Sequence, residues 1–416
     1  MKLTYHKRFT GLCILIIFLV SARARAQMPC EYDVTIIQAP VDCGIFGTVN
    51  TFGLGINENG AVVGYYQCPL WEHSEAFVWT AEDGFVTLER PEGVYSAGAV
   101  DINDNGVICG TAWMFDLGKR GFVYEDGKMT ILDPVIPDAG WSSASAINNA
   151  GIVVGQRSIT KNLNPKNAYF WSVEEGFTDL GVMNGPNSSA TDINENGDIC
   201  GWMGNTFFAP DARAFYTTQE VIVLEPVPGG FQSAAFALNN QSNLVGTGWV
   251  TLKGFPIGAP CAFLWDAGKY TMLGALPDHM LSRSDDINDK GVIVGGSSYV
   301  DGNSNIHHAI IFYDQVLFNL NDFIDPELQL LLKSASAISN SRRIVAVGND
   351  GEGEILSLLL TPLPEPLGDL SGDCQVRTAD LLLLLNAWAT QDLSADLNDD
   401  GIVNHLDLFL LFDNWG

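Results

Sequence analysis

The sequence predicts a mainly β protein: a seven-bladed β-propeller closed by its N-terminal strand, followed by a small α-helical domain with two calcium loops. Three observations lead to this prediction. A motif recurs seven times between residues 32 and 361, each copy has the pattern of short strands, and the last 49 residues contain two acidic 12-residue loops.

The repeats share the motif Ile-Asn-x-x-Gly, followed by an apolar pair and a second Gly. The second positions of successive copies lie 46, 45, 46, 45, 49 and 51 residues apart, which indicates one structural unit per copy. The fifth copy begins with Leu, and the last has Ser in place of Asn. The copies begin at Ile56, Ile102, Ile147, Ile193, Leu238, Ile287 and Ile338.

Each copy has the pattern of four strands. Asn-Gly, or an equivalent turn pair, joins the first strand to a β-branched second strand. A third strand with aromatic residues follows, as in 76–79, and a Gly turn leads to a fourth, as in 85–88. Four short strands in about 45 residues are typical of one propeller blade. We expect the repeated Trp and Phe to pack between blades.

The two ends of the repeat region predict ring closure. Residues 32–37 look like a fourth strand with no unit before it, whereas the seventh unit supplies only 335–338, 344–347 and 355–360. The first strand would complete the last sheet and remove two exposed edges. An open stack of β-meanders is the alternative, but it would leave its end faces uncapped.

The repeat units resemble the HAF repeats of bacterial extracellular proteins, named for a His-Ala-Phe signature in the third strand. His308-Ala309-Ile310 is the nearest match, while Ala76-Phe77 and Ala262-Phe263 retain the last two residues. The resemblance covers residues 32–361. It implies an extracellular repeat protein and brings no biochemical activity with it.

The tail contains two loops with the spacing of calcium ligands. One runs from Asp369 to Asp380 and the other from Asp396 to Asp407, so their starts lie 27 residues apart. Each has oxygen-bearing side chains at positions 1, 3 and 5, a backbone carbonyl at position 7 and a carboxylate at position 12. The apolar spacing after each loop predicts helices over 380–388 and 407–415.

This duplicated loop–helix pattern resembles the type I dockerin domain, a calcium-dependent module that binds cohesins. Both loops end in Asp, as in dockerins. The resemblance implies two Ca²⁺ ions and a cohesin-like or cell-surface protein partner. Thr378-Ala379 and His405-Leu406 replace the usual Ser-Thr pair, so cohesin specificity does not carry over. The implied ligands are Asp369, Ser371, Asp373, Gln375 (carbonyl) and Asp380, then Asp396, Asn398, Asp400, Ile402 (carbonyl) and Asp407.

The two loops differ in the residue at position 6. Gly401 has the residue that the sharp turn favours, whereas Cys374 puts a Cβ where the backbone conformation makes one costly. We therefore expect the second loop to bind calcium more tightly than the first.

The N-terminus predicts export. A basic start, an apolar run over 12–20 and Ala24-Arg25-Ala26 indicate a signal peptide of residues 1–26. The expected order is then a propeller (27–360), a Pro-rich linker (361–367) and the dockerin-like domain (368–416), with no membrane span. Removing residues 1–26 changes the net charge from −28 to −33, which disfavours nucleic acid as a partner.

Seven Cys remain after residue 26, and their spacing fits no disulfide or zinc framework. Cys30–Cys43 is the one pair that we considered. Cys109 and Cys200 occupy equivalent repeat positions, so we expect buried thiols.

Catalytic motifs do not appear in the sequence. The adjacent His307 and His308 point to opposite faces of a strand, which is poor metal geometry. Asp101, Asp192 and Asp286 suggest either further calcium sites or side chains that hold their own turns, and we favour the second. Trp71, Trp113, Trp141 and Trp202 are expected near loops, where they could stack on sugars.

Two functions follow from these features. The first is a secreted, non-enzymatic protein whose propeller binds a carbohydrate or protein ligand and whose calcium-dependent tail attaches it to a cell surface or assembly. The alternative is an extracellular glycoside hydrolase active on polysaccharides, because dockerins usually accompany such enzymes.

Overall fold

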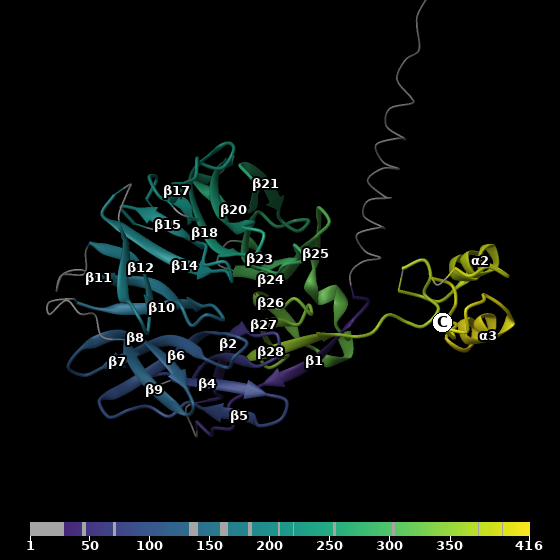
Figure 1. Ribbon diagram of the computed structural model, residues 1–416, viewed down its shortest axis with the longest axis horizontal. Helices are drawn as coiled ribbons and strands as arrows, with labels where there is room; N and C mark the ends of the chain where they lie inside the picture. Colours follow the sequence, from purple (N-terminus) through teal and green to yellow (C-terminus); the bar gives the residue numbers. More distant parts are fainter. Residues whose placement is uncertain are drawn as a thin grey trace, which may run out of the picture.

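The computed structural model describes residues 29–416 except for short segments (Figure 1). The predicted signal peptide therefore lies outside the described residues. The segments left out are 44–46, 70–71, 133–139, 159–164, 182–184, 207–208, 219, 253–254, 302–303, 373 and 393.

The protein is mainly β, as the sequence predicts, and each repeat supplies an antiparallel meander. The first three repeats form β2 (Asn50–Ile56), β3 (Val62–Gln67), β4 (Glu75–Thr80) and β5 (Gly84–Thr87); β6 (Val94–Ile102), β7 (Ile108–Met114), β8 (Gly118–Glu125) and β9 (Lys128–Leu132); and β10 (Ser142–Ile147), β11 (Val153–Ser158), β12 (Lys166–Ser172) and β13 (Gly176–Gly181).

The next three repeats form β14 (Asn187–Ile193), β15 (Ile199–Gly204), β16 (Arg213–Thr217) and β17 (Val221–Val223); β18 (Gly230–Leu238), β19 (Leu244–Leu252), β20 (Phe255–Asp266) and β21 (Lys269–Gly274); and β22 (Leu281–Ile287), β23 (Ile293–Asp301), β24 (Ser304–Tyr313) and β25 (Val316–Asn319). A single parallel pair, Lys166 with Asn187, joins the third and fourth meanders into one eight-stranded sheet.

The last repeat forms a sheet with the N-terminal strand. Its strands are β26 (Leu331–Ile338), β27 (Ile344–Asn349) and β28 (Ile355–Pro362), and β1 (Tyr32–Ile37) lies antiparallel to β28. The register runs from Tyr32 opposite Pro362 to Ile37 opposite Ser357. Figure 1 shows β1 and β28 side by side despite their distance in sequence. The pairing expected from the sequence is present.

The first strand of each repeat contacts the first strand of the next, and β26 contacts β2. The seven meanders therefore form a closed cycle of neighbours, although each sheet is itself open. The longer last interval of the repeat accommodates two 3₁₀ turns between β25 and β26, η2 (Leu320–Phe323) and η3 (Pro326–Leu328).

The Asn of the repeated motif links neighbouring repeats. Asn103 accepts hydrogen bonds at Oδ1 from the backbone N–H groups of Asn105 (3.1 Å) and Val107 (2.9 Å), which holds its own turn. Its Nδ2 donates to the carbonyl oxygen of Asn148 in the next repeat at 3.0 Å. The same inter-repeat bond is made by Asn57, Asn148, Asn194, Asn239 and Asn288.

The residue after the Asn forms a second cycle of hydrogen bonds. Its backbone N–H donates to the side-chain oxygen of the equivalent residue in the next repeat, at 2.6–3.0 Å. The last of these bonds runs from Asn340 to Glu58 and closes the cycle. Its members are Glu58, Asp104, Asn149, Glu195, Asn240, Asp289 and Asn340.

The second Gly of the motif is needed because the first strand bulges toward it. The bulge in β22 lies between Ser284 and Asp286. A Cβ added at Gly295 would lie 2.1 Å from the carbonyl oxygen of Arg283. Gly110 faces the carbonyl of Gly98 in the same way, at 2.2 Å. A side chain at these positions would displace the strand.

The aromatic residues of the third strands form the core, as expected. Phe77, Phe122, Phe215 and Phe263 are all buried. Cys109 and Cys200 are buried free thiols, which confirms the prediction for them.

The predicted pair Cys30–Cys43 is wrong. Cys43 forms a disulfide with Cys68, and Cys30 forms one with Cys374. Cys30 and Cys43 flank opposite ends of β1, and six extended residues span about 20 Å. That separation exceeds the Cα–Cα distance of about 7 Å at which a disulfide can form.

The tail contains two α-helices, α2 (Thr378–Asn386) and α3 (His405–Asp413), which each begin two residues before the predicted start. Figure 1 shows both beyond the edge of the β region. Leu384 and Leu411, equivalent residues in the two helices, are fully buried together with Val376 and Val403. Within the described residues, no helix combines the length and apolar character needed to cross a bilayer.

Candidate calcium-binding loops

The first loop is held by two carboxylates that accept backbone hydrogen bonds. Asp369, at position 1, accepts from the N–H of Gly372 (2.8 Å) and of Cys374 (2.7 Å). Asp380, at position 12, accepts from the N–H of Ser371 (2.7 Å) and of Arg377 (2.8 Å). These bonds fold the loop so that both carboxylates lie against backbone N–H groups.

The second loop repeats three of these four bonds at equivalent positions. Asp396 accepts from the N–H of Gly401 at 2.7 Å, as Asp369 does from Cys374. Asp407 accepts from Asn398 (3.2 Å) and from Asn404 (2.7 Å), as Asp380 does from Ser371 and Arg377. Two segments 27 residues apart thus fold into the same loop, which a disordered acidic tail would not do.

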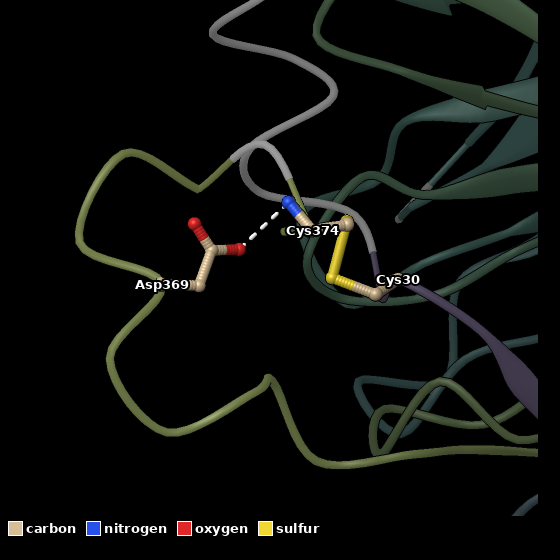
Figure 2. A group of neighbouring side chains, drawn as sticks. All are labelled: Cys30, Asp369 and Cys374. Atoms are coloured by element: carbon tan, nitrogen blue, oxygen red, sulfur yellow. Dashed lines mark hydrogen bonds between the residues drawn. A yellow bond between two sulfur atoms is a disulfide. The ribbon is translucent and has the colours of Figure 1, made fainter. Parts of the chain in front are cut away.

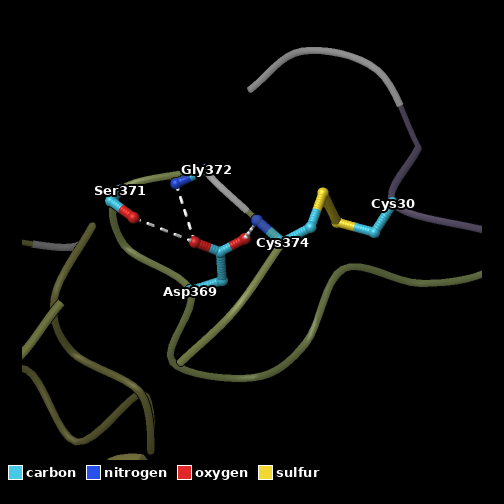
Figure 3. Close-up of a disulfide and its surroundings, with 5 residues drawn as sticks. All are labelled: Cys30, Asp369, Ser371, Gly372 and Cys374. Atoms are coloured by element: carbon cyan, nitrogen blue, oxygen red, sulfur yellow. Dashed lines mark hydrogen bonds between the residues drawn. A yellow bond between two sulfur atoms is a disulfide. The ribbon is translucent and has the colours of Figure 1, made fainter. Parts of the chain in front are cut away.

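Position 6 has a left-handed backbone in both loops. The φ angle is 90° at Gly401 and 68° at Cys374. The prediction that Cys374 sits in a conformation costly for a Cβ is therefore confirmed. Its sulfur bonds to Cys30, and Figure 2 shows the disulfide beside the carboxylate of Asp369. Figure 3 shows that carboxylate between the backbone of Gly372 and that of Cys374.

The structure describes all but one of the remaining predicted ligands of the two loops. Asn398 accepts from the N–H of Asp400 at 3.1 Å and donates to the carboxylate of Asp400 at 3.0 Å. The carbonyl oxygen of Ile402 accepts from Asn404 Nδ2 at 2.9 Å. In the first loop Gln375 is exposed. Asp373 lies outside the described residues.

Two of the loop carboxylates, Asp380 and Asp400, have a pKa below the usual value for aspartate. Burial raises the pKa of Asp380, but hydrogen bonds from the N–H groups of Arg377 and Ser371 outweigh it, and the pKa lies below its usual value. At Asp400 the amide of Asn398, then the N–H of Ile402 and the amide of Asn404, lower the pKa. Ionised oxygen ligands suit a hard divalent cation.

The carboxylates of neither loop bring three ligand atoms together around one point within the part of the chain that the structure describes. Among the described residues, one group of His, Cys, Asp and Glu has at least three ligand atoms within 4.8 Å of one another: Cys30, Asp369 and Cys374. Both sulfurs belong to the disulfide, so this group is not a metal site. The loop carboxylates are held by N–H donors instead. Their oxygens, with the carbonyls at position 7, are the ligands that calcium prefers.

The two helices have an exposed apolar surface that we did not predict from the sequence. Three equivalent pairs are exposed: Leu382 with Phe409, Leu385 with Phe412, and Trp388 with Trp415. Leu382 is 62% and Phe409 59% exposed. The signal was available, because both helices are apolar around most of their circumference, whereas a helix that covers a core needs one apolar stripe.

Asp101, Asp192 and Asp286 accept hydrogen bonds from the backbone near their own turns, which is the interpretation that we favoured over further calcium sites. Asp286 accepts from the N–H of Ile287 and, in the next repeat, from that of Ile338, both at 2.7 Å. Asp101 and Asp192 make the same pair of bonds to their own and the following repeat. Burial raises the pKa of all three carboxyls. The link to the next repeat was not foreseen.

The Trp residues that the sequence suggests for stacking on sugars are less accessible than that role requires, where the structure describes them. Trp113, Trp141 and Trp202 are half-buried, and Trp71 lies outside the described residues. The ammonium group of Lys119 lies 5.9 Å from the ring centre of Trp113 and 5.3 Å from that of Trp141, so lysine contacts both rings. His307 and His308 line separate cavities, consistent with their opposite directions along β24.

No protein-family model and no curated protein matches the chain. Several solved structures have a similar arrangement at low identity. A β-propeller domain of the Trilobed protease from Pyrococcus furiosus is 8% identical with a TM-score of 0.48, covering 74% of this chain and 93% of that chain. An oligogalacturonate lyase in complex with manganese is 10% identical with a TM-score of 0.49, covering 80% and 97%.

A virginiamycin B lyase from Staphylococcus aureus is 9% identical with a TM-score of 0.46, covering 80% of this chain and 100% of that chain. At these identities and TM-scores the likeness supports no statement on activity. The description of the fold rests on the strand pairing given above.

Proposed function

We propose that the chain is a secreted protein in which a seven-bladed β-propeller, closed by its N-terminal strand, serves as a binding or scaffold module. The dockerin-like tail binds two calcium ions and attaches the propeller to a cell-surface or assembly protein. The observation that carries this proposal is the matched hydrogen bonding of the two loops, in which equivalent N–H groups reach the carboxylates of positions 1 and 12.

Calcium would be held by the side-chain oxygens of positions 1, 3, 5 and 12 and by the carbonyl at position 7 of each loop. The ion supplies positive charge that draws the carboxylates together, and this orders the helix that follows. In the second loop, Asn404 Nδ2 donates to the carbonyl oxygen of Ile402 and to the carboxylate of Asp400 (3.2 Å), so this amide releases two oxygens when the ion binds.

A seven-bladed propeller is supported by three features of the β region. Seven meanders follow one another in a cycle, β1 completes the last of them, and the hydrogen bond from Asn340 to Glu58 joins the last repeat to the first. Disulfides form and persist in oxidising compartments, so Cys30–Cys374 and Cys43–Cys68 support export.

Attachment through the tail is supported by its exposed apolar surface. An apolar patch repeated on two equivalent helices is typical of a protein-binding face. Since the helices follow directly on the loops, calcium binding controls the spacing of Leu382, Leu385, Phe409 and Phe412. We assign a folded protein domain, similar to a cohesin, as the partner.

Calorimetry with the full chain tests calcium binding. We expect two ions to bind and helical content to rise, and EDTA should expose the tail to protease. Unchanged helicity and protease resistance after EDTA would contradict the proposal.

Attachment is tested with labelled chain and washed envelopes of the producing cells. Phe409→Asp should abolish calcium-dependent retention. Val173→Asp, at an 81% exposed position in the β region, is the matched control and should retain it. Equal retention of both variants would show that the helices are not the attachment face.

A further inference from the structure

A cavity of about 460 Å³ opens between three consecutive repeats. It is lined by β18–β20 of the fifth repeat, β22–β24 of the sixth and the start of β26 in the seventh. Leu281 and Lys333 lie at the starts of their strands, so the cavity is at the opposite end of the sheets from the Ile-Asn turns. Its volume is within the range of about 300–1,000 Å³ that is typical of small-ligand sites.

The charge of this cavity differs from that of the chain as a whole. The sequence has 49 Asp and Glu against 21 Lys and Arg. Nevertheless the described residues that line the cavity include Arg283, Lys333 and His307, and no carboxylate. The neighbouring cavity of about 580 Å³ contains Asp278 and Asp322. A cationic cavity in a strongly acidic protein selects an anion.

The basic side chains of the cavity lie close enough for Lys333 and Arg283 to affect the charge of His307. Arg283 Nη2 donates to Ser334 Oγ at 3.3 Å, and its Nε pairs with Asp285 at 3.0 Å outside the cavity lining. Burial lowers the pKa of His307, and the positive charges of Lys333, Arg283 and His279 lower it further. His307 is therefore a neutral hydrogen-bonding group at pH 7. Among the described residues, Lys333 is the cation of the cavity that forms no salt bridge.

The apolar part of the cavity lining suits a sugar ring. Trp249 and Pro260 are cross-strand neighbours and, with Phe236, form an apolar face. Thr247, Ser282, Ser297, Ser298 and Ser334, which bear hydroxyl groups, also line the cavity. Thr247 is 3% exposed, and its Oγ1 has no hydrogen-bond partner among the described residues. A buried hydroxyl without a partner favours a ligand that supplies one.

We propose that this cavity binds a uronic acid, with its carboxylate on Lys333 and Arg283, its ring against Trp249, and a ring hydroxyl on Thr247. A hydrocarbon acid would leave the hydroxyl groups unused, and a neutral sugar would leave the cations unused. The free sugar and a uronate residue of a polysaccharide share this chemistry. This inference rests on the proposed role of the β region as a binding module.

Titration calorimetry of the full chain in calcium-free buffer tests the assignment. D-glucuronate should bind, whereas D-glucose and benzoate should bind at least about tenfold more weakly, because charged hydrogen bonds and buried hydroxyl partners are lost. A uronate trisaccharide that binds more tightly than glucuronate indicates a polysaccharide ligand, and equal affinity indicates the free sugar. Glucose or benzoate binding as tightly as glucuronate would overturn the proposal.

Three variants and one control locate the site. Lys333→Ala should weaken glucuronate binding at least about tenfold, and Thr247→Val by a factor of about five to ten. Gly296→Val should abolish binding by filling the cavity, because an added Cβ meets Lys333 O and Ser334 Oγ only at 3.8 and 3.9 Å, which leaves the fold intact. Lys269→Ala, at the exposed first residue of β21, removes the same charge and should change nothing.

Thermal unfolding of each variant verifies that it is folded. Equal affinities of Lys333→Ala and Lys269→Ala, or full binding by folded Gly296→Val, would overturn the site. A calcium titration of the same samples separates the two proposals. Calcium binding without glucuronate binding refutes the cavity assignment alone, and the reverse result refutes the calcium-dependent tail.

Discussion

Cys30 and Cys374 form a disulfide that spans 344 residues and joins the start of the β region to the sixth position of the first calcium loop. Cys30 lies two residues before β1, the strand that completes the last sheet. The backbone N–H of Cys374 donates to Asp369, the first residue of the loop. One covalent bond therefore couples the strand that completes the β region to the first of the two loops that we propose to bind calcium.

Loss of this disulfide should weaken calcium binding at the first loop. The bond restricts the backbone of Cys374 to the left-handed conformation that the loop requires, so the loop without it must be ordered by the ion alone. For Cys30→Ser/Cys374→Ser we expect the affinity of one of the two ions to fall about threefold to tenfold, measured by calorimetry of the full chain.

The double variant Cys43→Ser/Cys68→Ser is the control, since it removes the other disulfide far from both loops. It should leave both calcium affinities unchanged. An equal loss in the two double variants would mean that the effect is one of general stability, not of the loop.

Substitution of carboxylates in the second loop should reduce calcium binding more than substitution in the first loop. Asp396→Ala with Asp400→Ala should abolish most calcium binding, because the second loop has Gly401 at the left-handed position and binds more tightly. Asp369→Ala should cost less, because the first loop already includes the strained Cys374. Calorimetry measures the loss of calcium affinity in each variant, and equal losses would refute this ranking.

The stability of the β region should decrease as the pH rises from about 4 to 6. Burial raises the pKa of Asp286 to about 6, and the N–H donors of Ile338 and Ile287 offset only part of that increase. The folded chain therefore holds a proton that the unfolded chain, with an aspartate pKa of about 3.9, has lost. The free energy of unfolding falls through this window, by about 3 kcal/mol for a shift of this size.

Asp286→Asn should reduce this pH dependence, measured by urea unfolding in EDTA from pH 4 to 7, while Asp101 and Asp192, whose pKa values burial also raises, retain their contributions. The substitution also lowers stability overall, because an amide nitrogen replaces one of the two oxygens that accept from Ile287 and Ile338. Asp266→Asn, at the exposed last residue of β20, is the control and should keep the wild-type slope. Equal slopes in the two variants would rule out Asp286 as the source.

The parts of the fold that follow from local pattern were predictable from the sequence. Strand periodicity and the orphan strand 32–37 predicted the meanders and the pairing of β1 with β28. Loop spacing predicted the turns around Asp369 and Asp396. What escaped prediction depends on distant residues that meet only after folding: Cys30 with Cys374, the inter-repeat bonds of Asn103 and Asp286, and the cavity at Lys333.

The seventh repeat offers a test of the hydrogen-bond cycle, because Ser339 stands where the other repeats have Asn. Ser339 Oγ accepts from the N–H of Arg343 at 3.2 Å. In place of the missing Asn amide, Arg343 Nη1 donates to a backbone carbonyl of the first repeat, that of Glu58, at 3.3 Å. Ser339→Asn should add a bond to the carbonyl of Asn57 and raise the free energy of unfolding by about 1 kcal/mol.

The reciprocal change supplies the control for this last prediction. Asn57→Ser recreates the seventh-repeat turn in the first repeat, removes the donor to the carbonyl of Asn103 and should lower stability by a similar or larger amount, since that buried acceptor loses its partner. Thermal and urea unfolding of both variants measure the two effects. If Asn57→Ser is neutral and Ser339→Asn is destabilising, the motif Asn shapes only its own turn, and the ring is held by packing between sheets.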